Sequence, residues 1–247
     1  MDSARFVKQL AAIHDLELRA HRAAALIAAL PDGDAISLLW ALVDRGQGRS
    51  RAASSALEGV LRGCHLHLDA ATLAQLCTAA EVAERPELVS LLRDCAAARD
   101  IAGEREGFVD REMRARTLGE RKQLARSHDR DLLARLASDP EPSVLRALLQ
   151  NPRLTEREVL IAASRRPTRA ALLEEIYRAA RWSQNHRVRR ALALNPYTPP
   201  TLAVTQLSSL TAPDLQEIAR DASLSTVVRV QARRMLAARS SSPDEKL

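Results

Sequence analysis

One segment of this chain recurs 44 residues further along, and this repeat limits the fold more than any other feature. Each copy holds three apolar residues at helical spacing followed by an Asn-Pro pair. The first copy is Val144, Ala147, Leu148, Asn151 and Pro152, and the second is Val188, Ala191, Leu192, Asn195 and Pro196. A period of 20 to 50 residues indicates stacked structural units, each of which needs its neighbours to bury its apolar face. The repeat therefore predicts an array of similar units.

Signals beside the repeat place helices on both sides of the Asn-Pro pair. Proline disfavours the helical conformation in the residue before it, and Asn bonds nearby backbone groups in turns. Thr155 and Glu158 then form a capping-box pattern that starts the next helix. A third, looser copy runs from Ile218–Asp221 to Val228 and echoes Leu136–Asp139 before Val144.

The composition predicts an all-α protein. Hydrophobic residues make up 46% of the chain but aromatic residues only 2%, and eight glycines leave little material for hairpins. No stretch alternates apolar and polar residues as a strand does. In the first hundred residues, six amphipathic segments are separated by helix signals: Pro31, Gly46 and Gly63 as ends, Asp69 as a cap and Pro86 in a first turn.

Charge divides the chain unevenly. Residues 1–100 contain 11 basic and 13 acidic residues, so the net charge of +6 arises entirely after residue 100. Between residues 101 and 119 charged residues interrupt the helical pattern. We expect an N-terminal helical repeat stack over 1–100, a charged linker or exposed helix over 101–119, C-terminal repeats over 120–239 and a disordered tail over 240–247.

The segment Val188–Pro199 resembles the unit of the leucine-rich repeat variant proteins, a HEAT-like family, and residues 144–152 are a weaker copy. The resemblance covers about residues 130–236 and implies a right-handed α-solenoid. Two features depart from the family. The 44-residue spacing is longer than its unit and implies an extra helix at about 168–180, and the cysteines that hold its iron–sulfur centre are missing. We therefore expect the architecture without the cofactor.

The sequence offers few residues for catalysis or metal binding. Cys64, His65, His67 and Cys77 are metal-type ligands, but their spacing matches no standard zinc site, and Cys77 lies on an apolar helix face. There is no glycine-rich phosphate loop and no nucleophile elbow. We expect no metal, no cofactor, no small-molecule substrate and no enzymatic activity.

The candidate binding residues lie in the basic part of the chain. Arg146 and Arg190 hold equivalent repeat positions, so both should face the same side of successive units. The predicted partner-binding residues are Arg146, Asn151, Arg187, Arg189, Arg190 and Asn195. Guanidinium groups in a row suit the carboxylates of an acidic or extended protein segment, which favours a protein-interaction scaffold. A nucleic-acid-binding repeat protein and an ordinary solvated surface remain alternatives, although residues for base stacking are few.

The location of the protein is predicted from what the chain lacks. No segment reaches the roughly 18 apolar residues that span a bilayer, and no basic flank precedes an apolar run at the N-terminus. Three widely spaced cysteines suit a reducing compartment. We expect a cytoplasmic protein without a membrane association.

Overall fold

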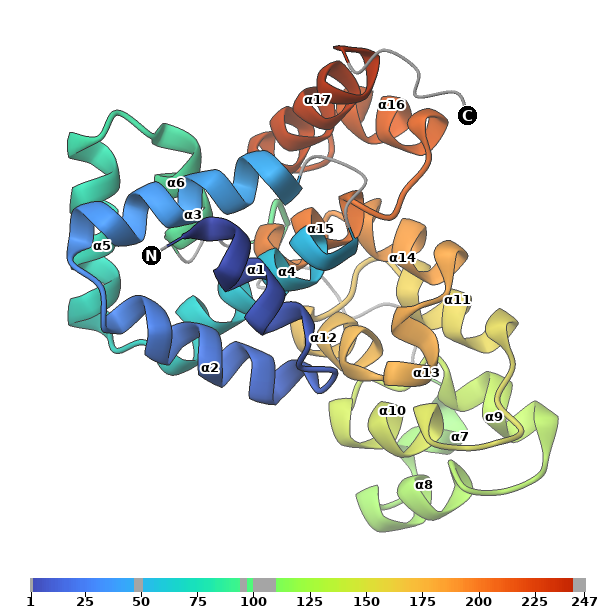
Figure 1. Cartoon of the computed structure of the whole chain (residues 1–247). Coiled ribbons are helices and arrows are strands. Elements are labelled where there is room, and N and C mark those ends of the chain that lie inside the picture. The colour runs from blue at the N-terminus through green and yellow to red at the C-terminus, as the bar shows by residue number, and fades with distance from the viewer. Residues whose placement is uncertain (1, 47–50, 94–96, 100–109, 242–247) are drawn as a thin grey trace. The chain divides into compact units, whose positions relative to one another are not determined.

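A computed structural model describes residues 2–46, 51–93, 97–99 and 110–241 (Figure 1). Within those ranges every regular element is a helix, which confirms the all-α prediction. The residues form two compact units. The first contains residues 1–95, 200–221 and 226–247, and the second contains residues 96–199 and 222–225.

This division differs from the predicted domain boundaries. Residues 120–239, expected as one set of repeats, are shared between the two units, because the third copy belongs with the N-terminal helices. Most of the predicted linker lies outside the described residues, and its remainder forms α7 (Arg111–Arg114) and the start of α8 (Leu118–Leu124). The first two residues of the predicted tail, 240 and 241, end α17 (Thr226–Ser241).

The first unit packs its helices around α4. Its N-terminal elements are α1 (Ser3–Ala11), α2 (Leu16–Ala28), α3 (Asp32–Gly46), α4 (Arg51–His67), α5 (Ala70–Val82) and α6 (Pro86–Leu92). Helices α1, α2 and α3 all contact α4. Asp69 caps α5 by accepting the Thr72 amide at 2.8 Å, and Pro86 lies in the first turn of α6, both as predicted. Helix α3 is described as far as Gly46, its predicted end.

Gly63 does not end a helix, contrary to the prediction. It lies inside α4, where a Cβ atom would collide with the carbonyl oxygen of Ala20 on α2. Glycine is required here because two helix backbones approach each other closely. Its role is therefore in packing, which a reading of helix ends along the sequence does not reveal.

The second unit contains two complete copies of a three-helix element. The first copy is α8, α9 (Arg130–Leu136) and α10 (Pro142–Leu149), and the second is α11 (Glu156–Ser164), α12 (Ala170–Arg178) and α14 (His186–Ala193). Thr117 and Glu120 form a capping box on α8, as Thr155 and Glu158 do on α11. The two boxes are 38 residues apart, whereas the Asn-Pro pairs are 44 apart, so the second copy is longer by six residues.

The extra length explains the wide spacing of the repeat. Helix α12 falls inside the predicted helix at about 168–180, but the first copy has an equivalent helix in α9. The core residues Leu133 and Leu136 of α9 correspond to Leu173 and Ile176 of α12 at a separation of 40. Four further residues follow α12, and the short helix α13 (Ala180–Ser183) lies there.

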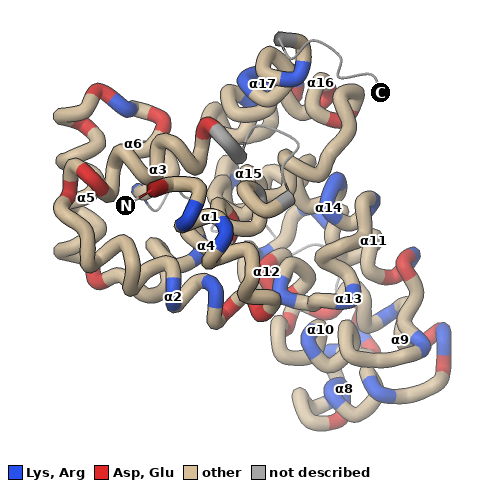
Figure 2. The backbone as a smooth tube through the Cα atoms, viewed as in Figure 1, with Lys and Arg blue, Asp and Glu red and all other residues tan. Residues whose placement is uncertain are grey.

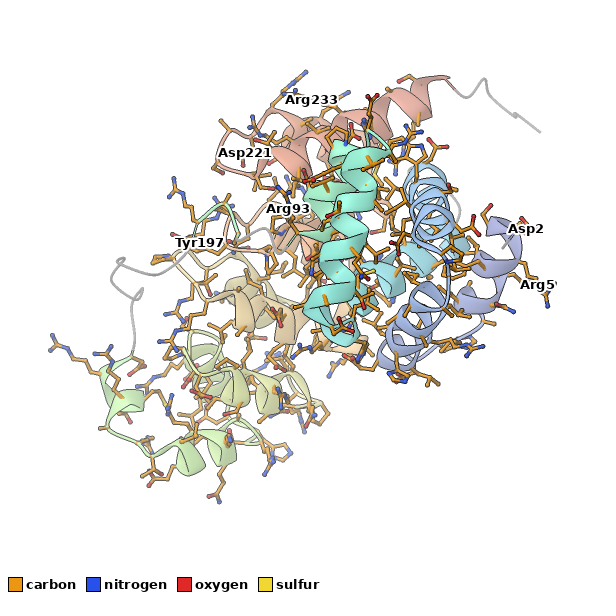
Figure 3. The ribbon with its side chains drawn as sticks, turned by 90° about the vertical axis from the view of Figure 1, so that its left-hand side faces the viewer. Asp2, Arg5, Arg93, Tyr197, Asp221 and Arg233 are labelled. Atoms are coloured by element: carbon orange, nitrogen blue, oxygen red, sulfur yellow. The ribbon has the colours of Figure 1, made fainter. Side chains whose placement is uncertain are left out.

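The third copy, in the first unit, consists of α15 (Pro200–Leu207), α16 (Ala212–Arg220) and α17. Thr211 and Asp214 form a capping box on α16, and α17 packs against both α15 and α16. Arg233 on α17, labelled in Figure 3, donates to the carbonyl oxygen of Ala219 at 3.2 Å, and the nearby Asp221 is labelled beside it. The third copy predicted from Ile218 and Val228 is thus a helical triplet of the same order.

Candidate anion-binding site

The two repeated asparagines hold the helices of each copy together. Asn151 follows α10, and its Nδ2 donates to the carbonyl oxygens of Ala125 and Ser127 at the end of α8, both at 2.8 Å. Asn195 follows α14 and donates in the same way to Ala163 at 2.9 Å and Arg165 at 3.0 Å, at the end of α11. Each amide therefore satisfies two helix-end carbonyls that have no partner within the helix.

The same asparagines also fix the turn that they start. Asn151 Oδ1 accepts the amide of Arg153 at 2.8 Å, and Asn195 Oδ1 accepts the amide of Tyr197 at 3.0 Å. Asn151 is only 3% exposed and Asn195 only 1%. Their predicted place on a partner-binding face is therefore wrong, because their polar atoms are buried and used within the fold.

Arg239, inside α17, takes the same role in the third copy, although the alignment of Val228 with Val188 would place Met235 there. Its Nη1 donates to the carbonyl oxygen of Leu210 at 2.7 Å and its Nη2 to that of Ser208 at 3.1 Å, at the end of α15. The same pair of helix-end carbonyls is thus bonded in all three copies. A guanidinium replaces the carboxamide in the third, which is why the sequence match is loose there.

Arg146, a predicted binding residue, is engaged in an ion pair. Its Nε and Nη2 bond both carboxylate oxygens of Glu175 on α12, at 2.8 and 2.6 Å. This pairing is the first cause of the lowered pKa of Glu175. Arg178 also contacts Glu175 and pairs with Glu174 at 3.1 Å, so the charges of this face are balanced. The Arg146 side chain is nevertheless 59% exposed.

The predicted arginines of α14 have separate partners. Arg187 pairs with Glu156 at 3.0 Å, and Glu156 also accepts a bond from Asn185 at 3.2 Å. Arg189 donates to the carbonyl oxygen of Ser183 and to Gln184 Oε1. Arg190 is half-buried. Figure 2 shows basic and acidic positions interspersed along the helices of the second unit, as a solvated surface requires.

A different set of arginines gathers around Asn151. Arg126 lies between the two carbonyls that bond Asn151 Nδ2, and Arg153 carries the amide that bonds Asn151 Oδ1. One buried carboxamide therefore joins the backbones of these two residues, although they are 27 positions apart. Both side chains are exposed. Among the described residues, neither guanidinium forms a hydrogen bond or an ion pair.

Arg181 brings a third guanidinium to the same turn. Its Nη1 donates to the carbonyl oxygen of Asn151 at 3.1 Å and its Nη2 to that of Leu154 at 3.2 Å, so it spans the segment that contains Arg153. Its Cζ lies 4.5 Å from the ring centre of Trp182, whose Nε1 donates to Leu149 at 3.2 Å. We call Arg126, Arg153 and Arg181 the Asn151 arginine cluster.

The carboxylates closest to this cluster in the sequence are engaged elsewhere. Asp129 caps α9 by accepting the amides of Asp131 and Leu132. Glu158 accepts hydrogen bonds from Thr155 in the capping box. Burial is the largest single influence on the pKa of Glu158 and raises it, but the Thr155 bonds and the charge of Arg130 together outweigh burial, so the pKa is lowered. Glu156 pairs with Arg187. In the described structure, none of these three carboxylates is bonded to an arginine of the cluster.

The cysteine and histidine set of the sequence analysis lies in the first unit. Cys64 is fully buried, and burial followed by the nearby Cys77 raises its pKa to about 12. His65 Nε2 lies 2.9 Å from the carbonyl oxygen of Leu91, while the His67 ring meets His21 edge-on at 5.2 Å. The two histidines therefore have partners outside this set. Among the described residues, no three metal-type side chains form a group that fits a metal ion.

An open groove of about 600 Å³ lies beside α5 in the first unit. Its lining is mostly small and apolar, and Asp32 is its single charged residue. This lining offers no acid and base pair for catalysis.

In the described part of the chain, no helix combines the length and the apolar character needed to cross a bilayer.

The sequence did not reveal the Asn151 arginine cluster, because an offset of 44 residues does not align Arg126 with its structural counterpart in the second copy, Ser164. The offset of 38 residues between the two capping boxes aligns Arg126 with Ser164.

Comparison with protein-family models, with curated proteins and with solved structures finds no match to this chain.

Proposed function

We propose that this chain is a non-enzymatic interaction scaffold that captures an acidic protein segment at the Asn151 arginine cluster. The observation that carries the proposal is the pair Arg126 and Arg153, which are exposed and have no side-chain partner in the described residues. Two unpaired guanidinium groups whose backbone segments are joined by one buried amide suit binding of carboxylates or other oxyanions. The predicted arginines Arg146 and Arg187 already pair with glutamates and contribute less.

The arrangement of helices supports a repeat architecture for this scaffold. Three helical triplets, each with the same bonded pair of carbonyls, are consistent with a HEAT-like solenoid of the kind that the leucine-rich repeat variant family builds. A cytoplasmic protein without a cofactor remains part of the proposal.

Aromatic burial favours a protein partner over a nucleic acid. Proteins that bind single strands stack bases on exposed aromatic rings. In the second unit, Tyr177 is 4% exposed, Trp182 6% and Tyr197 2%, so none of these rings is open for stacking. Duplex DNA, which needs only phosphate contacts, is distinguished by experiment.

The proposal is tested with a fluorescent peptide of about ten residues rich in glutamate, using fluorescence anisotropy on the full chain. Arg126→Gln with Arg153→Gln should weaken binding by roughly tenfold or more, because two unpaired cations are lost. The matched control Arg146→Gln with Arg187→Gln removes the same charge from paired positions and should change the affinity by about twofold or less.

Two outcomes would contradict the proposal. Equal losses in the two double variants would mean that only net charge matters and that the cluster is not a site. Tighter binding to random duplex DNA than to the acidic peptide, with a steep dependence on salt, would favour the nucleic-acid alternative.

A further inference from the structure

We infer that the Asn151 arginine cluster binds a phosphate group, so that the acidic segment captured by this chain carries a phosphorylated side chain. The inference rests on the proposed function and names the anchoring group of the partner. The cluster combines guanidinium groups from three segments: Arg126 follows α8, Arg153 follows α10 and Arg181 lies in α13.

Arg181 is preorganised for an oxyanion. A guanidinium has five N–H donors, and Arg181 directs Nη1 at Asn151 and Nη2 at Leu154 and Pro152 while its plane contacts the Trp182 ring. Its position is therefore fixed before a ligand binds, and the residue remains exposed with donors that these carbonyls do not use. A fixed donor loses less conformational entropy on binding than a mobile one.

Arg126 and Arg153 supply the mobile part of the cluster. Their backbone segments are joined through the buried Asn151 amide, so the two side chains start from linked segments. Both side chains are exposed and positively charged, so they repel each other when they approach. An anion placed between them would remove that repulsion and gain a charge-assisted bond to each.

The charge of the cluster matches phosphate better than carboxylate. A carboxylate brings one charge and two oxygens, whereas a phosphorylated serine or threonine carries about −1.5 to −2 at pH 7 and three acceptor oxygens. Three cations without a carboxylate bonded to them in the described structure can use all of these oxygens. Arginine also presents a planar fork that matches phosphate geometry, and all three positions are arginine rather than lysine.

The experiment compares three fluorescent peptides of one acidic sequence, with serine, glutamate or phosphoserine at the central position. Binding to the full chain is measured by fluorescence anisotropy. We expect the phosphoserine peptide to bind about tenfold or more tightly than the glutamate peptide. Its advantage should shrink from pH 7.5 to pH 5.5, because the second ionisation of phosphate lies near pH 6.

The variants locate the effect. Arg126→Gln with Arg153→Gln should remove the preference for phosphoserine, while Arg146→Gln with Arg187→Gln should keep it. Circular dichroism checks that both double variants remain helical. We expect no loss of helix for Arg126→Gln with Arg153→Gln, since these two side chains have no bonds in the described residues.

The outcomes separate this inference from the proposed function. Equal binding of the phosphoserine and glutamate peptides would overturn the phosphate inference and leave the acidic-segment proposal intact, whereas no binding of either would overturn both. Stronger binding of a 5′-phosphorylated oligonucleotide, or of vesicles with a phosphoinositide, than of the phosphopeptide would keep the phosphate chemistry but overturn the phosphorylated protein as its source.

Discussion

The Asn151 turn and the Asn195 turn are held in the same way but present different residues around them. Both asparagines bond two carbonyls at the end of an earlier helix and one amide two positions ahead. Around Asn151 the positions in those segments are Arg126 and Arg153, whereas around Asn195 they are Ser164 and Tyr197. The bonded framework therefore does not require arginine at either place.

The two turns also differ in what covers them. Tyr197, labelled in Figure 3, is buried. At the Asn195 turn, the backbone N–H of Arg99 donates to the carbonyl oxygen of Pro196 at 3.1 Å, and the guanidinium of Arg166 donates to that of Leu194. At the Asn151 turn the counterpart of Tyr197 is the exposed Arg153. Residues shared by the copies thus maintain the fold, and those that differ change which side chains each turn exposes.

The largest effect is expected from the shared asparagines themselves. Asn151→Ala or Asn195→Ala leaves two helix-end carbonyls and one amide without their bonds, which should cost about 3 kcal/mol in the free energy of unfolding. Urea denaturation followed by circular dichroism measures this cost. The two losses should be similar, because the bonds are equivalent. A loss below about 1 kcal/mol at either position would contradict the structural role assigned to these amides.

Arg239→Ala extends the comparison to the third copy. Arg239 bonds the same pair of carbonyls, but it is only half-buried, and water can replace part of its contribution. We expect a smaller cost of about 1 to 2 kcal/mol, and Arg239→Lys should recover only a part since an ammonium lacks the planar fork. A cost of zero in urea denaturation would separate the third copy from the other two.

The sequence predicted the helix ends around Asn151 and Asn195 but not the hydrogen bonds that these two side chains form. Asn-Pro pairs and the Thr155–Glu158 capping box are local signals, and the helix ends that they imply are present. The partners of Asn151 are backbone carbonyls 24 and 26 positions earlier, and a carbonyl carries no residue-specific signal. For this reason the burial of Asn151 and Asn195, like the contact of Gly63 with Ala20, required the three-dimensional arrangement.

Arginine usage shows the same limit. The basic residues suggested a partner-binding face, yet several guanidinium groups bond carbonyls at helix ends. Arg19 donates to Ile13 and His14, Arg165 to Ser138 and Arg181 to Asn151. A guanidinium has enough donors to bond two carbonyls at once, which lysine does less well. Counting basic residues therefore overestimates the number of N–H donors available to a partner.

Ser164→Arg tests whether an added arginine at the Asn195 turn is enough to create a second site for the phosphoserine peptide. Ser164 is exposed and corresponds to Arg126, and Arg166 already places a guanidinium at the Asn195 turn. We expect the variant to raise the summed affinity for the phosphoserine peptide by less than about twofold, because it adds a second, weaker site that fills with excess peptide. Ser164→Gln is the matched control and should have no effect. An unchanged affinity in titrations with excess peptide would show that the Asn195 turn cannot be converted by charge alone.

The smallest effect is on stability without a ligand, and its sign separates the two classes of arginine. Arg153→Gln removes a cation that lies near Arg126 and Arg181, so at low salt it should raise the free energy of unfolding by a few tenths of a kcal/mol. Arg146→Gln leaves the buried Glu175 without its main partner and should lower that energy by about 1 kcal/mol. Screening by salt should abolish the gain at position 153 but only reduce the loss at position 146, because Glu175 is buried. Urea denaturation at two salt concentrations measures both, and a loss of stability for Arg153→Gln would mean that Arg153 supports the fold and is not reserved for an anion.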